Sequence, residues 1–172
     1  MNSTSSINKF LPESEIYEIL LPRIEALINS GEPLISNLSN VTAALKEAFD
    51  KISWVGFYFL HNGKLYLGPF QGKPACTVID AGKGVCGAAV KLAKSVIVEN
   101  VDGFPGHIAC DSGSRSEIVI PIAAGNVILG VLDLDSYFLS AFNETDKSYL
   151  EKLSLMLTEK LAFNYLDPII KY

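Results

Sequence analysis

The chain has 172 residues, of which 49% are hydrophobic and 19% charged, so it can bury a full core and is not expected to be disordered. Its formal net charge is -5 and no basic cluster exceeds two residues, which argues against a nucleic-acid partner. The apolar runs are shorter than the roughly 20 residues that span a membrane. The polar N-terminus lacks an apolar signal region, so we expect a cytoplasmic protein without a membrane partner.

The first part of the chain predicts a loose leader at 1–12, followed by a helix. Apolar residues recur at helical spacing over 14–29, and Ser14 is a plausible N-cap. Pro22 lies inside this stretch and should kink the helix or split it in two. The turn residues at 31–33 should end it.

A second helix is expected to follow, with Ser39 or Asn40 as its cap. Its apolar face should lie in the core and consists of Val41, Ala44, Leu45, Ala48 and Phe49. From residue 52 the chain becomes rich in aromatic and β-branched residues, which predicts strands.

Residues 52–60 and 64–70 are predicted to form two strands joined by a tight turn. Between them, Asn62-Gly63 is a dipeptide that favours a two-residue hairpin. Because side chains alternate across a strand, Trp54 and Tyr58 share one face. Their polar tips suit the wall of a pocket, and two ordinary core aromatics are the alternative.

The middle of the chain predicts short strands at 77–79 and 95–98 with a helix between them. That helix would begin at the glycine-rich turn 82–87 and end near Leu92. The turn lacks the spacing of a Walker loop. Cys86 would lie in the first helical turn, where the helix dipole would lower the pKa of its thiol.

Residues 102–116 form a loop rich in glycine and serine that carries His107 and Cys110. Loops of this length inside a compact domain are often binding or catalytic. His107 and Cys110 could form a Cys3His zinc site with Cys76 and Cys86. However, Cys76 and Cys86 are not spaced as the short pairs that structural zinc sites use. Acyl transfer, with His107 as the base for a Cys110 nucleophile, is a second alternative.

A redox role uses more of these residues. The chain has three cysteines and no C-x-x-C motif, which argues against a structural disulfide framework and against a thioredoxin-like site. A thiolate can take the oxygen of an oxidised sulfur and become a sulfenic acid, which a second thiol then converts to a disulfide. Three inert, buried thiols are the alternative.

Three carboxylates are predicted to gather on a pair of strands. The strands are expected at 117–123 and 127–135. Asp133 and Asp135 share one face of the second strand. A three-residue loop would place Glu117 opposite Asp133, whereas a two-residue loop would place Leu134 there, and we favour the first because it gathers all three acids. Such acids repel one another when no ligand is bound, so they suit a ligand that carries an ammonium group. The alternative is that they form a solvated, acidic end of the strand.

Asn143 or Thr145 should cap a last helix over about 144–165. Its apolar stripe should lie in the core and consists of Leu150, Leu153, Leu157 and Leu161. The order of helices and strands predicts an α+β fold, with a mainly antiparallel central sheet flanked by helices. No repeat or linker divides the chain, so we expect a single domain over 1–172.

Five segments in this order, with all three cysteines, closely resemble the free methionine-R-sulfoxide reductases, which are single GAF domains. The resemblance is close over 52–155 and looser in the flanking helices. The five segments are Gly68–Cys76, Gly82–Gly87, Phe104–Asp111, Ser116–Pro121 and Gly130–Ser136.

This resemblance implies a role for each cysteine. Cys110 corresponds to the catalytic cysteine that takes oxygen from the substrate sulfur. Cys76 corresponds to the principal resolving cysteine, and Cys86 to the secondary one. Thioredoxin would be the electron donor, no metal or other cofactor would be needed, and the protein would be a homodimer.

The resemblance also implies a pocket for free methionine sulfoxide. Glu117 would lie near the sulfoxide, and Asp133 and Asp135 would lie toward the amino group. Trp54 and Tyr58 would accept the methyl-thioether end. A GAF module that binds a small molecule for sensing and catalyses nothing is the alternative, because the same fold serves both purposes.

Overall fold

The computed structural model describes residues 7–108 and 110–163, so the predicted leader is covered only from residue 7. The helices are α1 (Glu13–Leu27), α2 (Leu34–Ala48), α3 (Gly84–Leu92) and α4 (Glu144–Lys160), with a short 3-10 helix at Val101–Gly103. The strands are β1 (Trp54–His61), β2 (Lys64–Gln71), β3 (Val78–Asp80), β4 (Val96–Val98), β5 (Ser116–Ala124) and β6 (Val127–Ser136).

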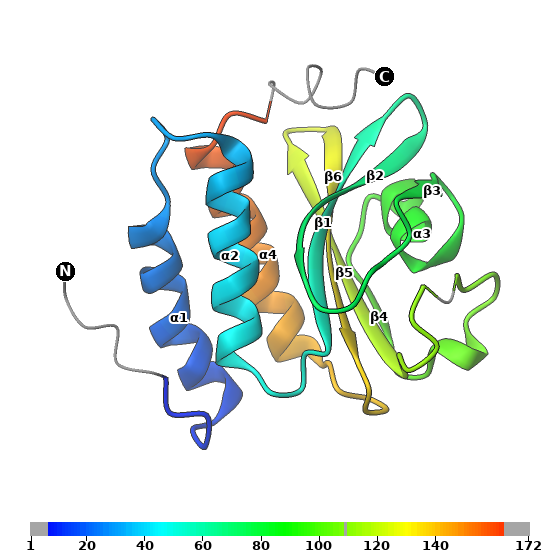
Figure 1. The fold of residues 1–172 in the computed structure, drawn as a ribbon, viewed down its shortest axis with the longest axis horizontal. Coiled ribbons are helices and arrows are strands. Elements are labelled where there is room, and N and C mark those ends of the chain that lie inside the picture. The colour runs from blue at the N-terminus through cyan, green and yellow to red at the C-terminus, as the bar shows by residue number, and fades with distance from the viewer. Residues whose placement is uncertain (1–6, 109, 164–172) are drawn as a thin grey trace.

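The strands form one sheet in the order β3-β2-β1-β6-β5-β4, with every neighbouring pair antiparallel. Helices α1, α2 and α4 form a layer on one face, while α3 and the connecting loops cover the other (Figure 1). This arrangement confirms the predicted α+β fold with an antiparallel sheet flanked by helices. None of the helices in the described ranges has the length and hydropathy that a membrane crossing needs.

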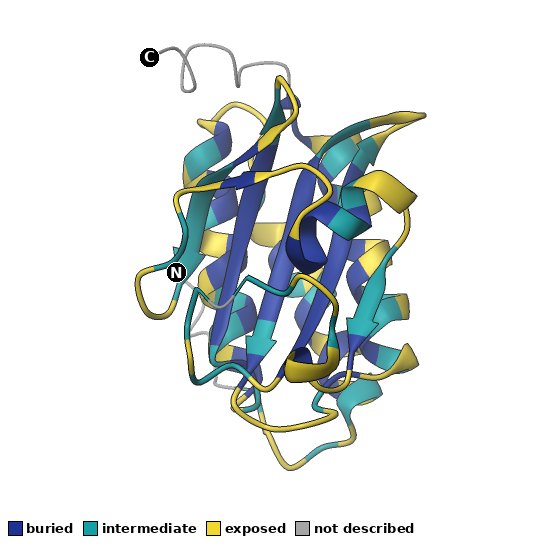
Figure 2. Cartoon of the chain, turned by 90° about the vertical axis from the view of Figure 1, so that its right-hand side faces the viewer, coloured by how far each residue is buried: buried dark blue, intermediate teal, exposed yellow. Residues whose placement is uncertain are grey.

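The first hairpin has the turn and the faces that its sequence predicts. Asn62 and Gly63 both have positive φ, of 48° and 76°, as a two-residue hairpin turn requires. On β1, Trp54 and Tyr58 point to the α3 side, and alternate residues point into the core under the helical layer: Val55, Phe57 and Phe59. Figure 2 looks onto the α3 side and shows buried strands behind exposed loops.

Helix α1 begins at Glu13, with Pro12 at the N-cap position, so the predicted cap at Ser14 is wrong. Pro22 lies inside the helix but does not split it, and the helix continues to Leu27. A proline removes one backbone donor and crowds the preceding turn. Burial of the apolar face of α1 against the rest of the domain offsets that loss.

Helix α2 begins at Leu34, so Ser39 and Asn40 lie within the helix and are not its caps. Pro33 occupies the N-cap position. The sequence places this proline among the turn residues after the first helix, yet proline also favours the start of a helix, where its missing donor has no partner to lose. The Ser39 hydroxyl instead donates to the carbonyl of Ile35, 2.7 Å away inside the helix.

Asn143 caps α4 as predicted, in a capping box with Asp146. The side chain of Asn143 accepts from the backbone of Asp146, and the carboxylate of Asp146 accepts from the backbone of Asn143. The leucine stripe of α4 is buried, as predicted: Leu150, Leu153, Leu157 and Leu161. The helix ends at Lys160, and positions 164–165 of the predicted helix lie outside the described residues.

The helical layer buries a carboxylate together with a cation. Asp146 is 0% exposed, and Lys51 Nζ lies 2.8 Å from each of its oxygens. The hydroxyl of Tyr17 donates to the same carboxylate at 2.8 Å. The charge of Asp146 is therefore paired and hydrogen-bonded where it is buried.

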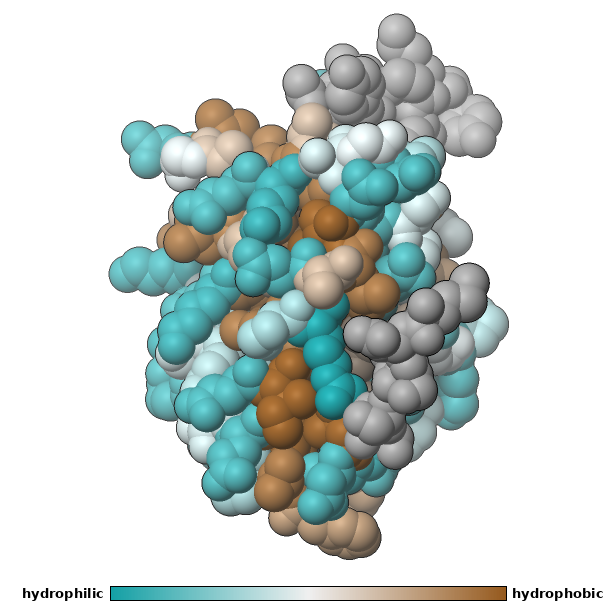
Figure 3. Space-filling model, turned by 90° about the vertical axis from the view of Figure 1, so that its left-hand side faces the viewer, coloured by the Kyte–Doolittle hydropathy of each residue, from teal (hydrophilic) through white to brown (hydrophobic). Residues whose placement is uncertain are grey.

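The outer surface of the helical layer is mostly hydrophilic, with an apolar strip among the polar side chains (Figure 3).

Candidate active site

Strands β5 and β6 pair in a register that neither predicted loop produces. The turn has two residues, and pairing starts with Ala124 opposite Val127, but a bulge near the turn adds one residue to β6. Glu117 therefore faces Asp135, and the prediction that it faces Asp133 is wrong. The bulge shifts the register by one, so the acids of both strands still point to the same face.

Glu117 and Asp133 are buried on this face, each with 6% of its surface exposed. Burial raises the pKa of Glu117 well above its ordinary range, and the charges of Asp133 and Asp135 raise it further. Burial also raises the pKa of Asp133. The pKa of Asp135 rises to about 6, again chiefly because it is buried, although a hydrogen bond from Ser114 lowers it. These acids hold protons much more tightly than exposed carboxyls do.

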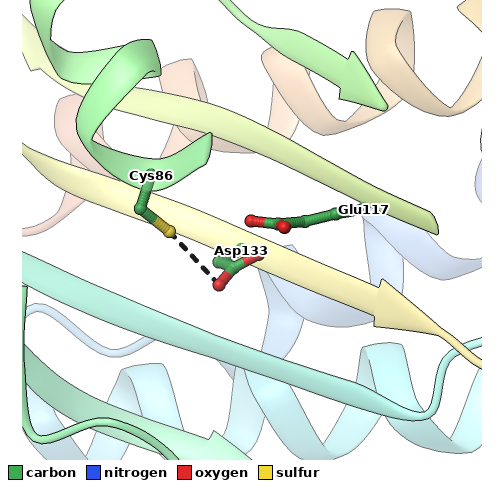
Figure 4. A group of neighbouring side chains, drawn as sticks. All are labelled: Cys86, Glu117 and Asp133. Atoms are coloured by element: carbon green, nitrogen blue, oxygen red, sulfur yellow. Dashed lines mark hydrogen bonds between the residues drawn. The ribbon is translucent and has the colours of Figure 1, made fainter. Parts of the chain in front are cut away.

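The thiol of Cys86 contacts this acid pair. Cys86 lies in the first turn of α3, and its Sγ donates to Asp133 Oδ2 at 3.2 Å (Figure 4). Burial and the charge of Asp133 raise the pKa of the thiol well above its ordinary value. The predicted lowering by the helix dipole is therefore wrong, because burial against a carboxylate outweighs a partial charge at the helix end.

Cys76 and Cys110 are joined by a disulfide that spans 34 residues of sequence, with their Cα atoms 5.4 Å apart. Cys76 follows β2, and Cys110 lies in the loop before β5. The disulfide therefore joins the loop that follows β2 to the loop that precedes β5. Cys86 has a free thiol and is buried, so it takes no part in this disulfide.

The histidine of the loop lies beside an acid. His107 Nε2 is 3.7 Å from Glu117 Oε2, and burial lowers the pKa of the imidazole, so it is neutral at neutral pH. Among residues 7–108 and 110–163, the metal-sized cluster of donor side chains is Cys86, Glu117 and Asp133. The Cys3His set that the sequence composition suggested does not form here, because two of its sulfurs are bonded to each other.

The two predicted aromatics line the pocket and also hold the Cys76 loop. The indole Nε1 of Trp54 donates to the carbonyl of Lys73 at 3.1 Å, and the hydroxyl of Tyr58 donates to the carbonyl of Cys76 at 2.9 Å. Gly56 makes room for the indole, since a Cβ there would lie 2.3 Å from the ring. Sequence reasoning found the aromatics but missed these tethers, whose signal was the glycine between them.

A polar cluster of Lys73, Asp111 and Tyr137 joins the two cysteine loops at the surface, and we call it the clasp. Tyr137 donates to Asp111 Oδ2 at 2.7 Å, and Lys73 Nζ lies 3.3 Å from the same carboxylate and 4.9 Å from the tyrosine ring centre. The backbone N–H of Gly113 donates to Asp111 at 2.9 Å. Sequence reasoning missed the clasp, because its members come from three separate segments.

These groups surround a pocket between the sheet, α3 and the two loops. Seven of the eight predicted site residues line it: Trp54, Tyr58, Cys86, Cys110, Glu117, Asp133 and Asp135. Cys76 reaches the pocket through its bond to Cys110. The free space inside is about 40 Å³, enough for a few water molecules.

The chain matches the family model described as GAF domain over residues 36–155. It is 51% identical over 146 residues to GAF domain-containing protein A of Dictyostelium discoideum, covering 84% of this chain and 92% of that protein. It is 43% identical over 150 residues to the free methionine-R-sulfoxide reductase of Escherichia coli, covering 87% of this chain and 91% of that enzyme.

A solved structure agrees over nearly the whole length. The free methionine-R-sulfoxide reductase of Neisseria meningitidis, in complex with its substrate, superposes with a TM-score of 0.87 at 39% identity. The match covers 99% of this chain and 100% of that one. The likeness therefore extends to both layers of the fold and to the loops around the pocket.

Proposed function

The chain belongs to the GAF domain family and, within it, to the free methionine-R-sulfoxide reductases, and from this membership we propose that it reduces free L-methionine (R)-S-oxide to L-methionine. The observation that carries the proposal is the pocket itself. A bonded pair of cysteines, Cys76 and Cys110, lies beside two buried acids, Glu117 and Asp133, and the half-buried Asp135. Thiol chemistry and a cation-binding surface are thus combined in one site.

In the proposed reaction, the sulfur of Cys110 attacks the sulfoxide sulfur and takes its oxygen, which leaves methionine and a sulfenic acid on Cys110. The thiol of Cys76 then attacks the sulfenic sulfur, and water leaves as the disulfide forms. The disulfide in this structure would be the product of that second step. Two thiols of thioredoxin would reduce it and become a disulfide themselves, which balances the two electrons taken by the substrate.

Glu117 is proposed as the acid for the sulfoxide oxygen. An oxygen leaves sulfur readily only when a proton or a strong hydrogen bond is supplied to it. Burial raises the pKa of Glu117, so its carboxyl holds a proton more tightly than an exposed glutamate does. The neutral imidazole of His107, 3.7 Å away, does not compete as a cation.

Asp133 and Asp135 are proposed to bind the ammonium group of the substrate. Buried acids that repel one another gain most from a cation placed between them. A methionine sulfoxide within a protein has an amide in place of the ammonium, so this site would favour the free amino acid. Trp54 and Tyr58, on the same pocket wall, are proposed to contact the methyl-thioether end.

Cys86 remains proposed as a secondary resolving thiol. Its raised pKa and its bond to Asp133 hold the proton on sulfur, so it would have to lose that proton to attack a sulfenic acid. A homodimer and a cytoplasmic location, where thioredoxin keeps thiols reduced, also remain predictions.

The test is a thioredoxin-coupled assay that follows NADPH consumption with each epimer of free methionine sulfoxide and with a peptide that contains the sulfoxide. We expect consumption with the free R epimer alone. Cys110→Ser should abolish it, and Cys76→Ser should form about one equivalent of methionine and then stall. Absence of consumption with all three substrates, from folded and reduced protein, would contradict the proposal and favour the sensing module.

A further inference from the structure

The base of the pocket brings together one sulfur and two carboxylates from three different elements. Cys86 comes from α3, Glu117 from β5 and Asp133 from β6 (Figure 4). One donor atom from each lies within 4.8 Å of the other two, and the sulfur is already 3.2 Å from Asp133. Ligands of a tetrahedral zinc ion lie roughly 3.5 Å apart. Side-chain movements of about 1 Å would therefore bring three of the four ligands of a tetrahedral zinc ion into position.

A second observation also points to a missing positive charge. Asp133 Oδ1 is buried and has no hydrogen-bond partner in the described part of the chain. Its other oxygen is occupied by the thiol of Cys86. An ionised carboxylate with one oxygen buried and unpaired is costly, because it has lost water without gaining a donor. In the empty pocket a proton held by Glu117 can be shared with Asp133, and a divalent cation would take the place of that proton and satisfy the unpaired oxygen.

The size of the free space fits an ion. With the disulfide closed, the pocket holds about 40 Å³ of enclosed free space, which is room for an ion with one or two waters. His107 lies on the same wall, with Nε2 3.7 Å from Glu117 Oε2, and neutral imidazole is a further nitrogen donor of the kind that zinc accepts.

We propose that Cys86, Glu117 and Asp133 form a binding site for a zinc-like divalent cation at the base of the pocket. The thiolate selects borderline ions such as Zn²⁺ or Cd²⁺ over Mg²⁺ and Ca²⁺, which prefer all-oxygen sites. On binding, the proton of Cys86 would leave to solvent. The ion would occupy the place that the proposed function gives to the substrate ammonium, so it would act as an inhibitor and not as a cofactor; this consequence rests on the proposed function.

The test uses the disulfide form of the full chain and Cd²⁺ as the probe. The chain has three cysteines, and two of them are bonded in this form, so Cys86 carries the one thiol. Cadmium bound to a thiolate gives a charge-transfer absorption in the ultraviolet. We expect one equivalent of Cd²⁺ to produce this band, Zn²⁺ to remove it by displacement, and Mg²⁺ to leave it unchanged.

Three variants decide whether the band comes from this cluster. Cys86→Ser should abolish it, and Asp133→Asn should weaken Cd²⁺ binding at least about tenfold, since a charged ligand is lost. Asp102→Asn, which removes an exposed carboxylate of the neighbouring loop, should bind Cd²⁺ as the wild type does. Circular dichroism and urea unfolding would verify that each variant is folded. No band with the wild type, or Cd²⁺ affinity unchanged in both Cys86→Ser and Asp133→Asn, would overturn the proposal.

The metal site and the proposed function can fail separately. The cadmium titration contains no reductant and no substrate, so a result there does not depend on turnover. L-Methionine at increasing concentration should lower the apparent affinity of the reduced protein for Zn²⁺, measured by calorimetry. If Zn²⁺ binds but methionine does not compete, the cation site stands and the assignment of the ammonium to Asp133 is wrong.

Discussion

The two faces of the sheet each bury carboxylates, but they balance the charge in opposite ways. Under the helical layer, Asp146 has Lys51 2.8 Å from both oxygens and a tyrosine hydroxyl as a further donor. On the α3 side, Asp133 receives one bond from a thiol, and no lysine or arginine of ranges 7–108 and 110–163 forms an ion pair with it or with Glu117. We expect the acid that is paired with a cation to be needed for stability, and the acids without a cation to serve the ligand binding proposed above.

Removing the cation of the helical layer should produce the largest effect. Lys51→Met would leave Asp146 buried with an unpaired charge, and we expect the free energy of unfolding to fall by about 3–5 kcal/mol. Urea unfolding followed by circular dichroism measures it. The matched control is Lys9→Met, because Lys9 pairs with the exposed Asp50 at the surface. That variant should lose less than about 1 kcal/mol, and equal losses in both would contradict the comparison.

The stability that the site face contributes should fall as the pH rises. The pKa of Asp135 is raised from 3.8 unfolded to about 6 folded, so the folded state holds a proton that the unfolded state has already lost. Its contribution to stability is complete below pH 4 and is lost as the pH rises through about 6. Relative to Asp135→Asn, the wild type should lose up to about 3 kcal/mol over this window. Unfolding curves of both proteins at pH 4 and pH 8 would test it, and parallel changes would be the contrary result.

Neutralising an acid of the site should not weaken the fold. For Asp133→Asn in the ligand-free protein, we expect stability to stay the same or rise by roughly 1 kcal/mol at pH 8, because a desolvated charge is removed. The same change should raise KM for free methionine sulfoxide about ten- to a hundredfold. Steady-state kinetics and urea unfolding separate the two effects. A clear loss of stability would mean that this acid serves the fold, as Asp146 does.

The smallest effect is expected at the clasp. Tyr137→Phe removes the hydrogen bond to Asp111, one residue from Cys110, and leaves the ring above Lys73. We expect disulfide formation after a single turnover to slow roughly two- to fivefold, since the loops are held together less precisely. Quenched-flow thiol counting measures this rate. Tyr149→Phe, which removes a tyrosine bond to Glu18 in the helical layer, should leave the rate unchanged.

The faces of the strands could be predicted from the sequence because alternation is local. Trp54 and Tyr58 lie on one side of β1 whatever the rest of the chain does. The turn at Asn62-Gly63 is equally local. The same alternation places Asp133 and Asp135 on one face of β6, whereas the position of Glu117 depends on the bulge. The roles of the cysteines came from the family resemblance, since no spacing rule pairs Cys76 with a cysteine 34 residues away.

The predictions that failed have two kinds of cause: contacts between separate segments, and local signals that fit two structures. The β5–β6 register depends on one bulged residue, which the residue types near the turn did not reveal. The pKa of Cys86 depends on Asp133, 47 residues further along the chain, and not on the helix that carries it. The predicted start of α2 failed for a local reason, because Pro33 is a turn residue that can also occupy the N-cap position of a helix, as it does before Leu34.

Trp54 is the single tryptophan of the chain, which makes the pocket visible to spectroscopy without a label. Its indole is buried in the pocket wall and donates to the loop that carries Cys76, whereas the helical layer contains no indole. Tryptophan emission, excited where tyrosine does not absorb, therefore reports one side of the molecule alone. Ligand entry, disulfide reduction and cation binding each alter the surroundings of that ring, so one fluorescence channel can follow all three in real time.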